Sequence, residues 1–273
     1  MGARARPGPP PAGARGGQAD SAHASAGPVP AGAAPAPAFY AVRGGRLGEL
    51  MTLLHPPYTA WHLSYFALGA ALAPHLYVNR LVWGLVAFGL AVGVAAHAFD
   101  ELHDRPLGTS LSGRTLLAAG VGALLGAVAI GVVGIITVSA WLLPFVLAGA
   151  LFLPAYNLEL AGGRFHGDVW FAVGWGAFPA LTGYFVNAET LAVPGLLIAG
   201  ACLLLSVAQR RLSSPARELR RRTASLEGTR TRTDGASETL SVAGLLRPLD
   251  GALAALSLAM VLVACAAVAA RLS

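Results

Sequence analysis

Long apolar runs separated by short polar stretches dominate the chain from residue 50 onward. Most runs are close to the ~20 residues that a helix needs to cross a bilayer. The predicted spans are 52–72, 81–98, two within 114–154 with a break near Gly131 to Thr137, 169–186, 190–208 and 249–270. The pattern predicts an all-α, polytopic integral membrane helical bundle of about seven transmembrane helices.

The N-terminal stretch follows a different pattern. Residues 1–38 are rich in Ala, Gly and Pro and contain no apolar run, so we expect a disordered segment there. The remainder, 39–273, is predicted to be the transmembrane helical domain, and its start, 39–50, to be a short interfacial helix. Between the sixth and seventh spans we expect a polar, arginine-rich loop, 209–247.

Composition excludes a soluble domain. The 273 residues are 55% hydrophobic and only 12% charged, whereas soluble domains carry about 25% charged residues. The two cysteines, Cys202 and Cys265, both lie inside apolar runs. They are predicted to be buried thiols, because the sequence has neither a disulfide framework nor a paired metal-binding motif.

Basic residues are distributed unevenly between the two sides of the predicted bundle. Of the 19 basic residues, all arginine, only Arg80 and Arg271 fall on one side. The positive-inside rule then places the N-terminus and the arginine-rich loop in the cytoplasm and the C-terminus outside, in a cell inner or plasma membrane. The formal charge of +6 is then explained by arginines that lie on the cytoplasmic side and contact membrane lipid. We expect no nucleic-acid partner.

The most informative polar stretch is 96–106, where the second span gives way to water. If the helix continues, Asp100 and Asp104 lie one turn apart on one face, with His97 one turn before Asp100. Two such carboxylates can share a hard cation such as Mg2+. Acidic residues at a helix C-terminus oppose the macrodipole, which favours this reading over an ordinary solvated helix end.

At these residues the chain resembles the UbiA superfamily of intramembrane prenyltransferases. That family has Asn-x-x-x-Asp-x-x-x-Asp at the end of its second helix, followed by Arg-Pro and Ser-Gly-Arg elements, and a tyrosine loop before its fifth helix. The matching positions are Asp100, Asp104, Arg105-Pro106, Ser112-Gly113-Arg114, Tyr156 and Gly167-Asp168. The resemblance covers roughly residues 50 to 212.

The resemblance implies an all-helical enzyme that moves a prenyl group from a polyprenyl diphosphate to a lipid-soluble acceptor. It assigns catalysis and Mg2+ binding to Asp100 and Asp104. Contact with the diphosphate or the rim of the site is expected from a second group of residues: Arg105, Tyr156, Asn157, Arg210, Arg211 and Arg217.

The chain also departs from the family pattern. Ala96 stands at the asparagine position, Leu160 stands at a lysine position, and the family has nine helices. Where a second acidic motif is expected, only Glu218 is acidic among several arginines. Those arginines either bind phosphate in place of a second metal or serve topology and attraction to anionic lipid.

Two other readings stay open. A non-catalytic protein of UbiA fold would bind an isoprenoid or a membrane partner, and the missing second motif favours it. A small transporter or channel is disfavoured, because the polar residues gather at one face instead of lining a path through the bilayer. A redox-metal site is disfavoured because His97 and His103 have no further paired ligands.

Overall fold

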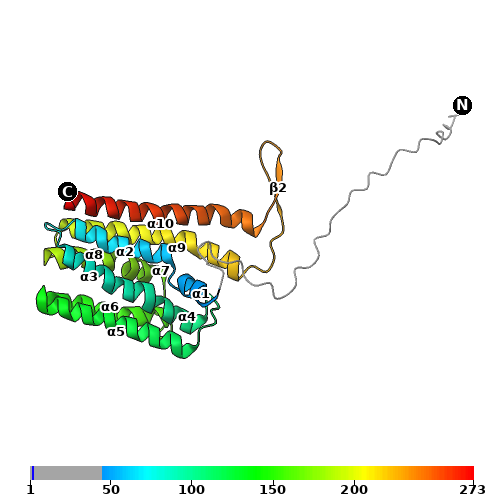
Figure 1. Ribbon diagram of the computed structural model, residues 1–273. Coiled ribbons are helices and arrows are strands. Elements are labelled where there is room, and N and C mark those ends of the chain that lie inside the picture. The colour runs from blue at the N-terminus through cyan, green and yellow to red at the C-terminus, as the bar shows by residue number, and fades with distance from the viewer. Residues whose placement is uncertain (1, 3–44) are drawn as a thin grey trace. The chain divides into compact units, whose positions relative to one another are not determined.

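The computed structural model describes Gly2 and residues 45–273 (Figure 1). The segment predicted to be disordered, 1–38, lies outside the described residues apart from Gly2. The described residues are mostly helical, at 76%, which confirms the all-α prediction. Residues 45–273 belong to one compact unit.

The elements follow one another with short connections. In chain order they are α1 Gly45–Leu53, α2 Pro56–Ala71, α3 Val78–Phe88, the π-helix η1 Gly89–Ala96, α4 His97–Asp104, α5 Gly113–Thr137, the 3-10 helix η2 Ala140–Leu142, α6 Leu143–Asn157, α7 Asp168–Phe171, the π-helix η3 Ala172–Ala177, α8 Phe178–Ala188, α9 Val193–Arg221, β1 Thr229–Thr231, β2 Ser237–Thr239 and α10 Val242–Leu272. The two strands form an antiparallel hairpin in which Arg230 pairs with Glu238.

Six helices in the described part of the chain are long and apolar enough to cross a membrane. They are Val78–Asp104, Gly113–Thr137, Ala140–Asn157, Asp168–Ala188, Val193–Arg221 and Val242–Leu272. The protein is therefore an integral membrane protein, as predicted. The predicted first span, 52–72, corresponds to α2, which has only 16 residues and falls below the usual length of a spanning helix.

Several predicted boundaries differ from the structure. Helix α5 is unbroken through Thr137, and the turn falls at the next two residues. About half of the predicted loop 209–247 is helical, since α9 continues to Arg221 and α10 begins at Val242. Residues 209–221 are mostly good helix formers, so the helix extends past the end of the apolar run. What remains of the loop contains the β1–β2 hairpin.

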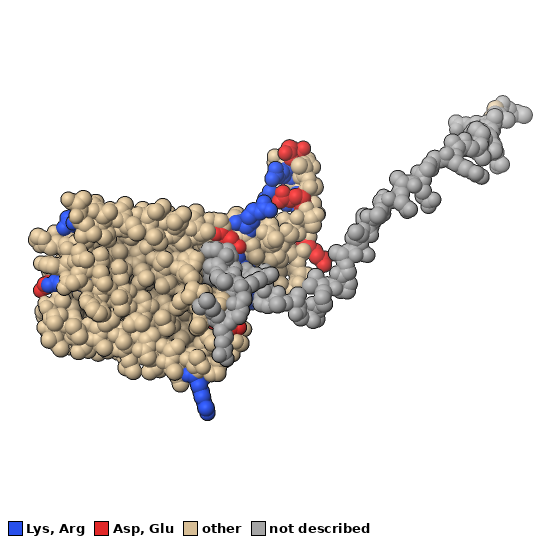
Figure 2. Space-filling view, in the orientation of Figure 1, with Lys and Arg blue, Asp and Glu red and all other residues tan. Residues whose placement is uncertain are grey.

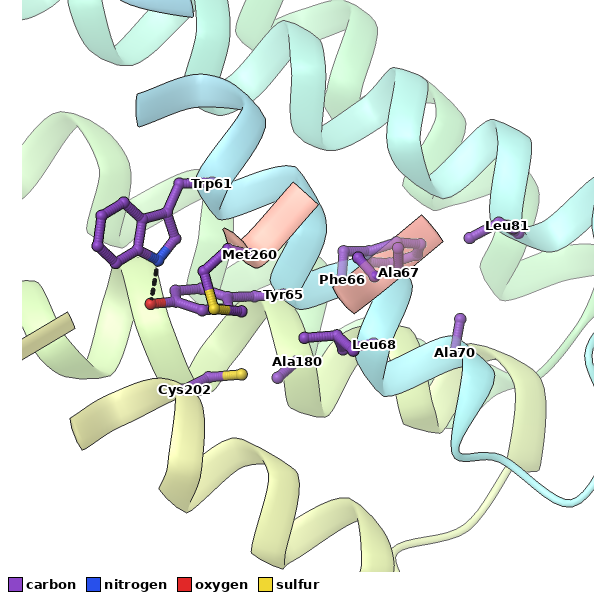
Figure 3. Close-up of a cluster of buried hydrophobic side chains, with 11 residues drawn as sticks. Trp61, Tyr65, Phe66, Ala67, Leu68, Ala70, Leu81, Ala180, Cys202 and Met260 are labelled. Carbon is purple, nitrogen blue, oxygen red and sulfur yellow. Dashed lines mark hydrogen bonds between the residues drawn. The ribbon is translucent and has the colours of Figure 1, made fainter. Parts of the chain in front are cut away.

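Helix α2 lies at the centre of the bundle and packs against α8 and α10. Trp61, Tyr65 and Phe66 are almost fully buried on it, and the Trp61 indole N–H donates to the Tyr65 hydroxyl (Figure 3). A Cβ added at Gly69 would lie 1.9 Å from the Ala180 carbonyl oxygen, so glycine is required where α2 crosses α8.

Polar interactions tie the loops together at each end of the bundle. At one end Arg80 pairs with Glu189 at 2.9 Å, and Arg271 donates to the Ala73 carbonyl oxygen. At the other end Arg220 binds Asp250, and Ser110 donates to Glu49. Charged side chains gather toward the two ends of the visible face and on the hairpin, with an uncharged surface between (Figure 2).

This arrangement supports a specific topology experiment. Reporter fusions after Gly163 and Asp234 should give cytoplasmic signals, and a fusion at Ser273 should give an external signal. The reason is the arginine asymmetry together with the gathering of these loops at separate ends. A cytoplasmic signal at Ser273 would mean that the chain crosses the membrane an even number of times.

Candidate functional site

The acidic stretch forms the last two turns of the long helical segment that ends at Asp104. Asp100 is partly buried in α4, and Arg217, Arg221 and His166 lie close enough to interact with it electrostatically. Asp104, one turn later, is exposed. The helix therefore presents one aspartate to the interior of the protein and the other to its surface.

Helix α9 supplies the arginines that face Asp100. Arg210, Arg217 and Arg221 are spaced seven and four residues apart, which places them on one helical face. The Arg210 Nε donates to Asp168 at 2.8 Å, and its guanidinium lies 5.3 Å from the centre of the Phe171 ring. Because α9 continues beyond the apolar run, this face reaches over the end of α4.

Tyr156 closes α6 beside this cluster. Its ring centre lies 4.3 Å from that of Trp175 and 4.6 Å from that of His166. Arg210, Arg217 and Asp100 all lie within electrostatic reach of it. The Tyr156 hydroxyl is buried and has no hydrogen-bond partner among the described residues. An unpaired buried hydroxyl is costly and is accounted for if a ligand supplies its partner.

Three other predicted site residues have different surroundings. Arg105 donates to the carbonyl oxygens of Thr109 and Leu111 in its own loop. Asn157 is buried and donates to Leu153 on its own helix at 2.8 Å. Arg211 is exposed on the outer face of α9. The structure thus brings together Asp100, Tyr156, Arg210 and Arg217, whereas Arg105 and Asn157 bond to nearby backbone and Arg211 is exposed.

Glu101 has a role that the sequence did not reveal. Its side chain is fully buried and accepts hydrogen bonds from the Leu107 N–H at 2.9 Å and from the Thr109 N–H at 2.7 Å. These bonds hold the turn in which Arg105 adopts a left-handed conformation, φ 50°. Glu101 therefore fixes how α4 ends and hence where Asp100 is presented.

Two histidines stack beside the cluster. The ring centres of His55 and His97 are 4.3 Å apart, with 18° between the planes. Burial, the His97 ring and the guanidinium groups of Arg221 and Arg217 hold the pKa of His55 well below its usual range. No pattern in the sequence links these two residues, because the contact arises only when the start of α2 packs beside α4.

The acidic side chains fit Mg2+ only in combination with a phosphate ligand. Within residues 45–273 no group of three or more His, Cys, Asp or Glu side chains is placed to hold a metal ion. Mg2+ is commonly held by one or two carboxylates together with substrate phosphates and water. Asp100 and Asp104 meet that lower requirement, and they do not form a cage for the metal by themselves.

An apolar cavity of about 440 Å³ lies in the half of the bundle that carries the Arg80–Glu189 ion pair. Its walls come from α3, α5, α6 and α8, and it reaches from Arg80 to Ala91, Leu124 and Gly149. This volume falls within the range of about 300–1,000 Å³ that is typical of ligand pockets.

The chain matches no protein-family model, no curated protein and no solved structure. The class that the fold defines is an all-α polytopic integral membrane protein with a cluster of arginine, aspartate and tyrosine side chains at one end of the bundle.

Proposed function

We propose that this protein is a UbiA-like membrane prenyltransferase that moves a prenyl group from a polyprenyl diphosphate to a lipid-soluble acceptor with the help of Mg2+. The observation that carries the proposal is the convergence of Asp100, Tyr156 and the α9 arginines. These residues come from three helices, and Asp100 and Arg217 are more than a hundred residues apart in the chain.

The charges of this cluster suit a diphosphate. Arg217 and Arg221 both lie near Asp100, and Arg210 and Arg217 lie near Tyr156, so several guanidinium groups gather at this point. Guanidinium groups match the oxygens of phosphate groups in geometry and charge. The unpaired Tyr156 hydroxyl adds a hydrogen-bond donor. Donors fixed in this way stabilise the charge that grows on a leaving diphosphate when its bond to the prenyl carbon breaks.

Asp100 and Asp104 are the residues that would hold Mg2+ against the diphosphate. When bound, the metal supplies additional neutralisation of the leaving oxygens. Within the chain, Glu101 keeps the end of α4 in place, and Asp168 orients the Arg210 guanidinium.

The apolar cavity supplies a place for the prenyl tail. Its wall includes Ala91, which precedes Asp100 on the same continuous helical segment formed by η1 and α4. A diphosphate held at Asp100 with its tail directed into the bundle would bring the tail to this cavity. Its lining contains several phenylalanines, including Phe88 and Phe178.

The alternative is a non-catalytic protein of the same fold that binds an isoprenoid or a membrane partner. The exposure of Asp104 favours it, as does the exposure of Glu218, the one acidic residue where a second acidic motif is expected. Binding without turnover of a prenyl diphosphate would distinguish this alternative from the enzyme.

A binding experiment tests the proposed site. Arg217→Gln should weaken binding of geranylgeranyl thiodiphosphate about tenfold or more while leaving its dependence on Mg2+ intact, because a charge-assisted contact is worth about 1.5–3 kcal/mol. Arg222→Gln is the matched control, since Arg222 is exposed at the end of the same helix. If the two variants bind the thiodiphosphate with equal affinity, the α9 arginines are not part of the binding site.

A further inference from the structure

A second apolar cavity lies where α2, α3 and α10 meet, as an open groove of about 480 Å³. Its floor contains the buried side chains of Ala67, Leu81 and Ala264, of which the first two belong to the cluster in Figure 3. Of its twelve lining residues only Ser64 and Cys265 have a polar side-chain atom. The Ser64 hydroxyl already donates to a carbonyl oxygen of its own helix at 2.7 Å. The groove therefore suits an apolar occupant.

The dimensions of the groove match one lipid chain. Helix α10 lines it from Val261 to Leu272, which is about 16 Å at 1.5 Å per residue. One leaflet of a bilayer has about 15 Å of hydrocarbon, half of the usual ~30 Å core. The groove volume spread over this length gives a cross-section of about 30 Å², whereas a helix about 10 Å across needs about 80 Å². The groove is therefore too narrow to take a helix from a second copy of the chain.

An arginine lies at one end of the groove. Arg271 directly precedes Leu272, and one of its terminal nitrogens donates to the carbonyl oxygens of Ala73 and Pro74. Its Nε and its other terminal nitrogen bind no hydrogen-bond acceptor within residues 45–273, and no carboxylate there pairs with it. By contrast, Arg80 at the same end of the bundle is paired with a glutamate at 2.9 Å. The charge of the Arg271 side chain is therefore not neutralised by another side chain.

We infer that this groove binds an anionic phospholipid, with one acyl chain along α10 and the phosphate at Arg271. Guanidinium groups match phosphate oxygens in charge and geometry, and the remaining N–H groups of Arg271 are free to donate. An arginine near the end of a spanning helix also lies at the depth of the lipid headgroups. The inference does not depend on the proposed function, because neither Asp100 nor the α9 arginines line this groove.

The native thiol of Cys265 reports directly whether the groove is occupied. Cys265 lines the groove and is exposed, whereas Cys202 is fully buried, so N-ethylmaleimide should modify only Cys265 in the folded chain. The experiment uses the purified full chain in dodecyl maltoside micelles with added dioleoyl phosphatidylglycerol. At ten times its dissociation constant this anionic lipid should slow the modification about tenfold, because the covered fraction follows mass action.

The headgroup and the arginine are tested separately. Dioleoyl phosphatidylcholine has the same chains and no net charge, so the concentration that halves the rate should be about fivefold higher, the factor that one arginine contributes near an anionic headgroup. In Arg271→Gln the two lipids should protect Cys265 equally. Arg222→Gln is the matched control and should keep the wild-type preference, because Arg222 is exposed at the end of α9, far along the chain from this groove.

Four results would overturn the inference. The first is no slowing by either lipid, and the second is equal protection of the wild type by both. The third is a preference for phosphatidylglycerol that survives in Arg271→Gln. If that variant fails to fold, the wild type at about 1 M salt replaces it, because the Debye length there is about 3 Å and the preference should vanish. The fourth is a modification rate that falls with protein concentration in the absence of lipid, which would identify a second copy of the chain as the occupant.

Discussion

Asp100→Asn should abolish the Mg2+-dependent binding of a prenyl diphosphate while leaving the bundle folded. Asp100 is the acidic residue of the 96–106 stretch that faces the α9 arginines. Removing it deletes a proposed metal ligand and a negative charge that lies within electrostatic reach of Arg217. Breaking a buried charge pair typically costs roughly 3–5 kcal/mol. A loss of this size would bring the remaining binding below the limit of detection. Calorimetric titration with geranylgeranyl thiodiphosphate, with and without Mg2+, measures the effect.

Two further substitutions are needed to interpret the Asp100→Asn result, one at the second carboxylate and one as a control. Asp104→Asn should also remove the Mg2+ dependence if both carboxylates hold the metal, although Asp104 is exposed. Asp234→Asn is the control, because Asp234 lies in the exposed turn of the hairpin and caps its own loop. Unchanged binding in both Asp100→Asn and Asp104→Asn would exclude the metal site and favour the non-catalytic alternative.

Gly183→Ala should strongly destabilise the bundle. A Cβ at Gly183 would lie 2.0 Å from the carbonyl oxygen of Phe66, which is backbone and cannot move aside without separating α2 from α8. Overpacking of this kind costs about 1–3 kcal/mol, and sometimes more. For a domain of this size each kcal/mol lowers the melting temperature by about 2–4 °C.

A thiol probe offers a direct measurement. Cys202 is fully buried and Cys265 is exposed, so in a Cys265→Ser background only unfolding exposes a reactive thiol. The control is Gly200→Ala, because a Cβ at Gly200 meets nothing within 4 Å. Equal melting temperatures for Gly183→Ala and Gly200→Ala would contradict the close crossing of α2 and α8.

Hydrophobic pattern predicted the spans well and their ends poorly. Apolar runs show where a helix lies in lipid, and six of the predicted spans correspond to helices long enough to cross. The pattern cannot show where the helix itself stops, because residues with high helix propensity extend it into water, as in α9 up to Arg221. The central position of α2 depends on packing that no single run encodes.

Part of the candidate site could be predicted from the sequence. Asp100, Tyr156, Arg210 and Arg217 were named from motifs, and they come together. Arg221 could have been found had α9 been extended, since it shares a helical face with Arg217. The buried role of Glu101 and the stacking of His97 on His55 depend on the loop and helix contacts formed in the folded chain.

The most direct test of the central claim is whether the purified wild-type chain, in lipid vesicles, consumes a labelled prenyl diphosphate when Mg2+ is present. The proposed prenyltransferase predicts release of diphosphate and appearance of the label in a lipid product, with both lost on chelation of Mg2+ and in Asp100→Asn. Tight binding of the prenyl diphosphate with no release of diphosphate would contradict the enzyme and identify an isoprenoid-binding membrane protein instead.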